Sequence, residues 1–303
     1  MSYARLIVNP VAGAGRAAKK WPHIMAQLRS IDLRFDYVIT EAPGHARELA
    51  KHAVAGGYKL VVSVGGDGTI NEVVNGLYDS GSIGDVRLGI IGTGTGSDYI
   101  RTIGVPRAYP DACQCLKDSR KVAVDVGVVE YNDGGEIVRR LFVNFAGMGF
   151  DAEIVRTTTL KYKKLNATAS YLAGLLSALV LYKNKVVALN IDGETIEEKV
   201  CSILFSNGKY SGSGMFAAPE ADVADGLLDV LIIGDLSKPD LLWSLPRVYR
   251  GTHLTHPKVT LRKAREIEVV GSDEPVSLQV DGELIGKVPA RIYIVPSLLN
   301  VVL

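Results

Sequence analysis

A glycine-rich turn with one embedded acid is the part of this sequence best suited to phosphate chemistry. Residues 65–69 are Gly-Gly-Asp-Gly-Thr, and they lie between an apolar run and a helical pattern that extends to Gly76. Glycines let backbone N–H groups approach a phosphate because no Cβ stands in the way. The carboxylate of Asp67 would repel that phosphate unless a divalent cation lay between them, and Mg²⁺ commonly takes this place. The turn therefore predicts a nucleoside phosphate, a metal, and phosphoryl transfer rather than hydride transfer.

Two more glycine turns follow apolar runs in the same part of the chain. Residues 9–15 are Asn-Pro-Val-Ala-Gly-Ala-Gly, and residues 92–96 are Gly-Thr-Gly-Thr-Gly. If the strands before them are parallel, all three turns lie at one edge of a sheet, outside the carboxyl ends of the strands. Ligands bind at this edge in open α/β sheets. The N-termini of the helices that follow add positive partial charge there.

The first of these turns also allows a second interpretation. Residues 13–18 match the Gly-x-Gly-x-x-Ala fingerprint of dinucleotide-binding folds, and Glu41 ends the next predicted strand. The motif is short, however, and Asn9 and Pro10 separate the strand from the glycines. A Walker-type loop, Gly-x4-Gly-Lys-Ser/Thr, does not occur in the sequence. The acid-containing turn at 65–69 is the stronger signal.

Alternating strands and helices must position these turns. Nearly continuous apolar runs predict buried parallel strands, and amphipathic stretches between them predict helices that cover the sheet. The pattern predicts a doubly wound α/β domain over residues 1–122. The predicted strands are 5–8, 35–39, 60–64 and 88–91, and the predicted helices are 16–30, 46–55 and 69–77.

From residue 122 onward the pattern changes to short strands separated by β-turn signals at 132–135, 192–193 and 281–282. Only residues 168–182 and 239–249 are predicted to be helical. The pattern predicts a β-rich second domain over residues 123–303, with the last residues able to return to the first domain. The predicted strands are 122–131, 136–144, 185–191, 200–207, 227–233, 259–261, 266–270, 276–280 and 291–295.

Composition and charge argue against several classes of protein. The chain has 303 residues and a formal net charge of +1, so a uniformly basic surface for nucleic acid is not expected. Three cysteines, an odd number, favour a reducing, cytoplasmic compartment over a disulfide framework. The start of the chain lacks the pattern of a secretory signal. The longest weakly polar stretch, residues 171–182, is shorter than the ~20 residues that a membrane span needs.

Taken together, these motifs resemble those of the diacylglycerol kinase-type lipid kinases, in particular the soluble bacterial branch. Six segments carry the resemblance. Residues 9–13 resemble the family's Asn-Pro-x-x-Gly turn, residues 65–76 its nucleotide loop, and residues 94–98 its Gly-Thr-x-Asn-Asp segment. Residues 221–230 resemble its acidic magnesium loop, and residues 253–259 and 281–283 resemble its later His and Asp-Gly-Glu motifs. The resemblance extends from Leu6 to Pro289. Gly-Gly-Asp-Gly-Thr alone is shared with NAD kinases, so the combination is what identifies the family.

The resemblance implies a fold and a reaction. The implied fold is NAD kinase- or phosphofructokinase-like, with an α/β domain, a β-sandwich-like domain, and the active site in the cleft between them. The implied reaction transfers the γ-phosphate of ATP, with Mg²⁺, to a lipid hydroxyl at the inner face of the membrane. Diacylglycerol is the default acceptor and gives phosphatidic acid; phosphatidylglycerol, a sphingoid base or NAD are alternatives. A homodimer is left open.

The resemblance also assigns catalytic roles. Glu283 is implied to be the general base that takes the proton of the lipid hydroxyl. Residues 192–194 are a second Asp-Gly-Glu, and spacing alone does not choose between the two copies. Asp67 is implied to hold the catalytic Mg²⁺ and is compatible with capping the helix before Ile70. Asp98 is implied to face the reacting phosphate.

Binding roles follow in the same way. A structural magnesium ion is implied at Asp222, Asp225 and the carbonyl group of Leu227. The implied nucleotide contacts are Asn9, Pro10, Val11, Ala12, Gly13, Thr40, Gly65, Gly66, Asp67, Gly68, Thr69, Asn71, Glu72 and Thr95.

Two positions depart from the family pattern. Ser97 stands where the family usually has Asn, which alters a polar contact near the reacting phosphate. Ala14 stands where some members carry a lysine, and Arg16 and Lys19 are the two candidates to replace its charge.

Two weaker signals lie in the second domain. Lys161, Lys163 and Lys164 precede the apolar stretch 171–182. They form either a basic patch for anionic headgroups or a solvated loop before a core helix. His253 and His256 have the spacing of a metal-ligand pair. The proline that follows them and the lack of a third ligand favour a structural role.

Overall fold

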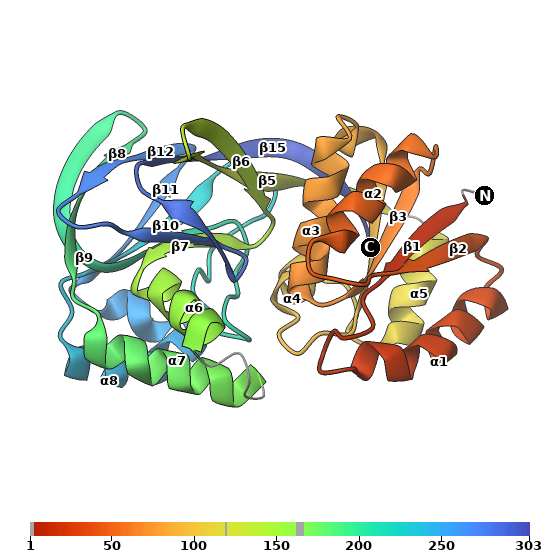
Figure 1. Cartoon of the computed structure of the whole chain (residues 1–303), viewed down its shortest axis with the longest axis horizontal. Coiled ribbons are helices and arrows are strands. Elements are labelled where there is room, and N and C mark those ends of the chain that lie inside the picture. The colour runs from red at the N-terminus through yellow and green to blue at the C-terminus, as the bar shows by residue number, and fades with distance from the viewer. Residues whose placement is uncertain (1–2, 119, 162–166) are drawn as a thin grey trace. The chain divides into compact units, whose positions relative to one another are not determined.

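The computed structural model describes residues 3–118, 120–161 and 167–303 (Figure 1). The chain packs into two units. The first comprises Met1–Val126 with Val223–Asp225 and Pro296–Leu303, and the second comprises Gly127–Asp222 with Gly226–Val295. The last residues of the chain thus belong to the first unit.

The first unit is built on a parallel sheet. Its strands are β1 (Ala4–Val8), β2 (Phe35–Ile39), β3 (Leu60–Gly65), β4 (Arg87–Gly92) and the end of β15 (Ala290–Val302). Their order is β15-β4-β3-β1-β2, and all these pairs are parallel. The four predicted strands are confirmed. Every residue of β3 is buried, as expected of a strand covered on both faces.

Helices cover both faces of this sheet. α1 (Arg16–Ser30) and α5 (Tyr109–Asp118) lie on one face, and α2 (His45–Ala55) and α3 (Asp67–Asp79) lie on the other (Figure 1). Trp21, Ile24 and Leu28 form the apolar face of α1 and are buried against the strands. Because the crossovers after β1 and β2 run to opposite faces, the strand order reverses between β1 and β3. Sheets of this kind bind ligands at such a reversal.

The second unit is β-rich, so the predicted fold class is confirmed for both units. The sheet order is β14-β13-β7-β9-β8-β12-β15, with β10 between β9 and β11, and β5 paired with β6. The predicted turns at 132–135, 192–193 and 281–282 join β5 to β6, β8 to β9, and β13 to β14. The strands are β5 (Lys121–Asp133), β6 (Glu136–Phe142), β7 (Phe145–Gly149), β8 (Lys185–Ile191), β9 (Glu194–Ser206), β10 (Leu228–Gly234), β11 (Val259–Ala264), β12 (Glu266–Ser272), β13 (Ser277–Val280) and β14 (Glu283–Lys287).

Three helices of this unit lie together on one side of its strands: α6 (Phe150–Lys161), α7 (Ala167–Leu181) and α8 (Lys238–Tyr249) (Figure 1). The prediction of only two helices was wrong, because α6 was missed. Its sequence contains three consecutive threonines and has no clear apolar stripe, so neither propensity nor periodicity marks it as a helix. Strands β7 and β14 were also missed, because both contain glycine, which is depleted in strands.

α7 is apolar on nearly all sides, and part of its surface is exposed. Leu176, Val180 and Leu181 of α7 are exposed, and Trp243 of α8 is 83% exposed. In the part of the chain that the structure describes, no helix has both the length and the apolar character needed to cross a bilayer.

Candidate active site

The three glycine turns leave the sheet at one edge and contact one another. β1 pairs with β3, and β3 pairs with β4, so the residues after each strand emerge side by side. The amide group of Asn9 donates to Thr69 Oγ1 at 3.0 Å. A Cβ added to Gly94 would lie only 2.6 Å from the Cα of Gly66, so the third turn can approach the second only because it has no side chain there. The structure thus brings the predicted turns into one site.

Arg16 adds a cation to this site. Its Nε donates to the carbonyl oxygen of Gly13 at 3.0 Å, and its Nη2 donates to that of Gly94 at 3.2 Å. The guanidinium therefore bridges the first and third turns. Of the two candidates to replace a lysine at Ala14, Arg16 is the one that these bonds hold beside the turns.

Two carboxylates lie at helix N-termini beside the turns. Asp67 is the first residue of α3, and its Oδ1 accepts from the N–H of Tyr99 at 3.1 Å. Tyr99 is the second residue of α4 (Asp98–Ile103), which begins at the buried Asp98. The N-cap of α3 is Gly66, so the interpretation of Asp67 as a capping residue was wrong. Its carboxylate links the starts of α3 and α4 instead.

This set of donors fits a magnesium nucleotide. Carboxylate oxygens are the ligands that Mg²⁺ prefers, and helix N-termini and glycine-turn N–H groups attract phosphate. Open space surrounds Gly68, where a Cβ would meet no atom within 4 Å. A phosphate can therefore approach the first turn of α3.

Two of the predicted nucleotide contacts bind other groups. Asn71 is fully buried, and its Oδ1 accepts from Asn75 at 3.1 Å, one turn later in α3. Glu72 accepts from the N–H groups of Gly44 at 2.9 Å and Ala46 at 3.0 Å. Glu72 therefore holds the N-terminus of α2, a favourable position for a carboxylate.

The other predicted nucleotide contacts lie in or beside the turns. Thr40 follows β2, is buried, and donates its N–H to the carbonyl oxygen of Val8 at 2.9 Å. Val11 is exposed and donates its N–H to Asn9 Oδ1 at 3.2 Å, while Thr95 is exposed between β4 and α4. The remaining ones in the turns are Pro10, Ala12, Gly13 and Gly65.

Glu283 belongs to the second unit and begins β14 after a tight turn. Asp281 and Gly282 have φ values of 45° and 88°, which form the left-handed pair of a hairpin turn. The carboxylate of Asp281 anchors this turn to the chain between β6 and β7. It accepts from the N–H groups of Val143, Asn144 and Phe145 at 2.9 to 3.2 Å.

The second Asp-Gly-Glu forms the same turn in a more exposed place. Asp192 accepts from the N–H groups of residues 265 and 266, and Glu194 pairs with Arg262 at 2.9 Å. Glu283 pairs with Arg140 at the same distance. The Arg140 side chain is 18% exposed, against 36% for Arg262. The two turns therefore differ in their surroundings rather than in their own geometry.

Arg140 was missed by the sequence analysis. It lies within β6, where one basic residue among others carries no signal. Its Nη2 contacts Glu283 Oε2 across 143 residues of sequence, a pairing that only the tertiary structure provides. The guanidinium fixes one oxygen of the predicted base.

The predicted structural magnesium loop stays a prediction. Asp222 and Asp225 are exposed in the loop before β10. No group of three or more His, Cys, Asp and Glu side chains that could hold a metal occurs in the described ranges. His253 is buried, and its Nε2 lies 2.9 Å from the carbonyl oxygen of Ala217. Burial lowers the pKa of His253, so the ring stays neutral in this structural contact.

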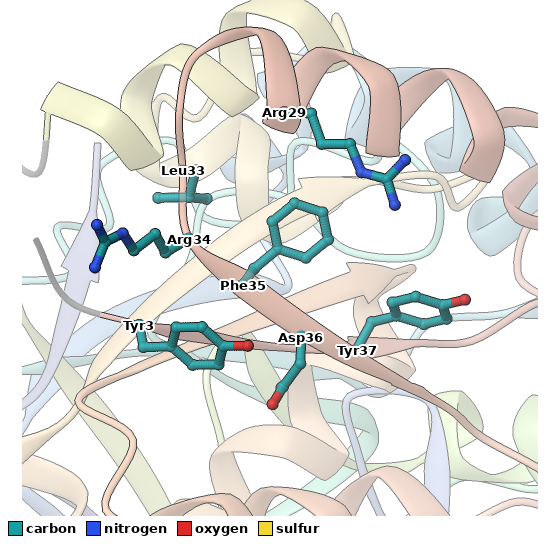
Figure 2. A pocket seen from close by; sticks show the side chains of 7 residues that line it. All are labelled: Tyr3, Arg29, Leu33, Arg34, Phe35, Asp36 and Tyr37. Atoms are coloured by element: carbon teal, nitrogen blue, oxygen red, sulfur yellow. The ribbon is translucent and has the colours of Figure 1, made fainter.

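An open hollow of about 500 Å³ lies elsewhere in the first unit (Figure 2). Its lining comes from the residue before β1, the end of α1, the segment that leads into β2 and the start of β2, and includes Tyr3, Arg29 and Tyr37. It opens at the amino ends of the strands, opposite the edge that carries the glycine turns. None of the predicted nucleotide contacts lines it, so its chemistry is separate from that of the turns.

The predicted basic patch falls outside the described residues. Lys163 and Lys164 lie in the segment 162–166, and the side chain of Lys161 is not described either.

Comparisons with known proteins give two family matches that together span most of the chain. Residues 3–129 match the diacylglycerol kinase catalytic domain, and residues 144–303 match the YegS C-terminal NAD kinase beta sandwich-like domain. The chain is 28% identical to a diacylglycerol kinase of Staphylococcus carnosus (strain TM300) over 290 residues, covering 95% of this chain and 90% of the relative. It is 29% identical to a diacylglycerol kinase of Bacillus subtilis (strain 168) over 294 residues, covering 96% and 93%.

A solved structure has the same fold. A diacylglycerol kinase from Bacillus anthracis str. Sterne matches with a TM-score of 0.73 at 21% identity, covering 99% of this chain and 96% of that chain.

Proposed function

This chain belongs to the bacterial diacylglycerol kinase family, a family of phosphotransferases, and we propose that it transfers the γ-phosphate of ATP to the hydroxyl group of a lipid. The observation that carries the proposal is the contact between the three glycine turns, with Asp67 and Asp98 at the adjoining helix N-termini. Diacylglycerol, which gives phosphatidic acid, is the acceptor that we propose.

In this proposal the first unit binds the nucleotide. The N–H groups of the turns and the starts of α3 and α4 face the phosphates, and Arg16 adds a positive charge. Asp67 would hold Mg²⁺, and Asp98 would face the reacting phosphate. When bound, the ion neutralises phosphate charge and orients the transferred group.

Glu283 provides the base in this proposal. Its carboxylate accepts the proton of the lipid hydroxyl as the oxygen forms a bond to the γ-phosphorus and the bond from that phosphorus to ADP breaks. General bases of this kind contribute ~10²–10⁴-fold to the rate. Arg140 holds Oε2 in place.

We also propose that the enzyme acts at a membrane surface, because its proposed acceptor is a lipid. The exposed leucine and valine side chains of α7 and the exposed Trp243 of α8 support this, because tryptophan is enriched at membrane–water interfaces. Co-sedimentation with lipid vesicles tests this contact.

One assay tests the reaction and the acceptor together. The full chain is incubated with γ-labelled ATP and Mg²⁺ against diacylglycerol, phosphatidylglycerol and a sphingoid base in vesicles, and against NAD. We expect label in diacylglycerol. Label in NAD alone, without dependence on vesicles, would point to the soluble-substrate kinase, and label in none of the acceptors contradicts the proposed function.

The control variants use the two Asp-Gly-Glu turns. Glu283→Gln is expected to fold normally and to lose ~10²–10⁴-fold in turnover, because its amide cannot accept the proton. Glu194→Gln alters the matching residue of the exposed turn and is expected to keep its turnover. A Glu283→Gln enzyme with near wild-type turnover would remove this residue from the mechanism.

A further inference from the structure

The turn that carries Glu283 is supported from behind by a buried polar pair. Gln279 of β13 is fully buried, and its Oε1 accepts from the N–H of Gly282 at 2.8 Å. Its Nε2 donates to Asp151 Oδ2 at 2.6 Å. A single amide thus connects the backbone beside Glu283 to a carboxylate at the start of α6.

The neighbouring strand leaves room for this pair. Gly147 of β7 lies opposite Gln279 in the antiparallel register. A Cβ at Gly147 would lie 2.4 Å from Asp151 Oδ2 and 2.7 Å from Gln279 Nε2. The missing side chain is therefore what allows the two groups to meet.

The two partners leave the amide of Gln279 only one orientation. The N–H of Gly282 can only donate, and the ionised carboxylate of Asp151 can only accept. The amide must therefore direct its oxygen to Gly282 and its nitrogen to Asp151. A reversed amide would break both bonds and leave polar groups unpaired inside the protein, which is unfavourable.

The exposed twin turn lacks this second connection. Asn190 Oδ1 accepts from the N–H of Gly193 at 2.8 Å, as Gln279 does from Gly282. Asn190 is half-buried, and none of the hydrogen bonds described for this structure joins its amide to a carboxylate. The same turn therefore forms without a buried acid behind it, so the fold does not require Asp151 for the turn itself.

We propose that Gln279 is a positioning residue for Glu283 and that Asp151 fixes the orientation of the Gln279 amide. The inference rests on the proposed function, in which Glu283 is the base. The Gly282 N–H belongs to the peptide unit between Asp281 and Gly282, one residue before Glu283, so its hydrogen bond limits where the carboxylate of Glu283 lies. Displacing a reacting group by about 1 Å can cost ~10²-fold in rate.

Kinetics of three variants test the proposal: Gln279→Leu, Asp151→Leu and the double variant. We expect each single variant to lower kcat by ~10²-fold with little change in the KM for ATP, whose proposed contacts lie in the first unit. Because the two residues act in series, the double variant should be no slower than the slower single one. Asp151→Asn keeps an oxygen that can accept from Gln279 and should retain more activity than Asp151→Leu.

A matched control and a second readout separate positioning from general damage. Asn190→Leu in the twin turn should lower the melting temperature as Gln279→Leu does, with kcat close to wild type. The Gly282 amide should be protected from hydrogen exchange in the wild type and should exchange fast in Gln279→Leu.

The outcomes distinguish this inference from the proposed function. A folded Gln279→Leu enzyme with near wild-type kcat, or single effects that multiply in the double variant, would overturn the inference. A wild type that phosphorylates none of the acceptors would overturn the proposed function. In that case unchanged Gly282 exchange in Gln279→Leu would overturn the structural link as well.

Discussion

At the scale of single residues, Asp151 carries a charge in an unfavourable place. Burial raises the pKa of its carboxyl group to about 6, above the ordinary value near 3.8, although the bond from Gln279 opposes the shift. A folded-state pKa above the unfolded one means that the folded protein holds this proton more tightly. The free energy of unfolding therefore falls as the pH rises from about 4 to about 6, and it stays lowered above that range.

We predict that Asp151→Asn removes this loss, because the amide has no charge to bury. The variant should match the wild type near pH 4 and exceed it above pH 6 by on the order of 2–3 kcal/mol. Thermal denaturation of both proteins across this range measures the difference. Parallel stability curves would contradict the raised pKa.

Sequence could predict which residues gather at the sheet edge, but not every direction in which they point. Asn71 and Glu72 share a helix with Asp67, and their types suit a nucleotide. Their partners, Asn75 and the start of α2, follow from the rotation of α3 and its packing on α2, which a motif does not encode. Arg140 could not be found either, because its pairing with Glu283 depends on tertiary contact alone.

At the scale of elements, the first turn of α3 combines a helix start with a proposed phosphate site. We predict that Gly68→Ala keeps or slightly raises stability, since alanine is favoured over glycine in a helix by ~0.5–1 kcal/mol and its Cβ meets no atom within 4 Å. The same Cβ would occupy the space needed by a phosphate. Affinity for ATP with Mg²⁺ should fall by about tenfold or more, or ~1.4 kcal/mol.

Gly94→Ala is the matched comparison for this prediction. Its Cβ would lie 2.6 Å from the Cα of Gly66, so both the melting temperature and the affinity should fall. Calorimetric titration and thermal denaturation measure the two effects separately. If Gly68→Ala binds the nucleotide as the wild type does, the first turn of α3 is not part of the phosphate site.

The elements that sequence predicted are those with a strong local signal. Strands β1, β3 and β4 of the first unit are apolar runs that end at glycine or Asn-Pro, and the hairpins are marked by Asp-Gly or Gly-Gly. α6 has no such signal, because its threonines do not favour a helix. Packing against α7 and the strands stabilises this helix instead. The buried pair behind Glu283 depends on α6, so it could not be predicted from the sequence.

At the scale of the whole molecule, β15 contributes to both units. Its first residues pair with β12 in the second unit, and Asn300 and Val301 pair with β4 in the first. The residue that follows them, Val302, is buried among the side chains of α1 and the parallel strands. The stability of the first unit therefore depends on the last few residues of the chain.

We predict that Val301→Asp unfolds the first unit. Val301 is fully buried beside Leu88, and an unpaired carboxylate there costs several kcal/mol of a total stability of ~5–15 kcal/mol. Trp21 is buried in this unit and Trp243 is exposed in the other, so a Trp243→Phe background leaves one tryptophan as the reporter. Emission of Trp21 should shift to the red, and ATP binding should be lost.

Asn300→Ser changes the opposite side of the same strand and should cost only its bond to the Gly84 carbonyl, about 1 kcal/mol. If Trp21 emission in Val301→Asp is not shifted to the red and ATP binding is intact, the first unit does not need its final strand.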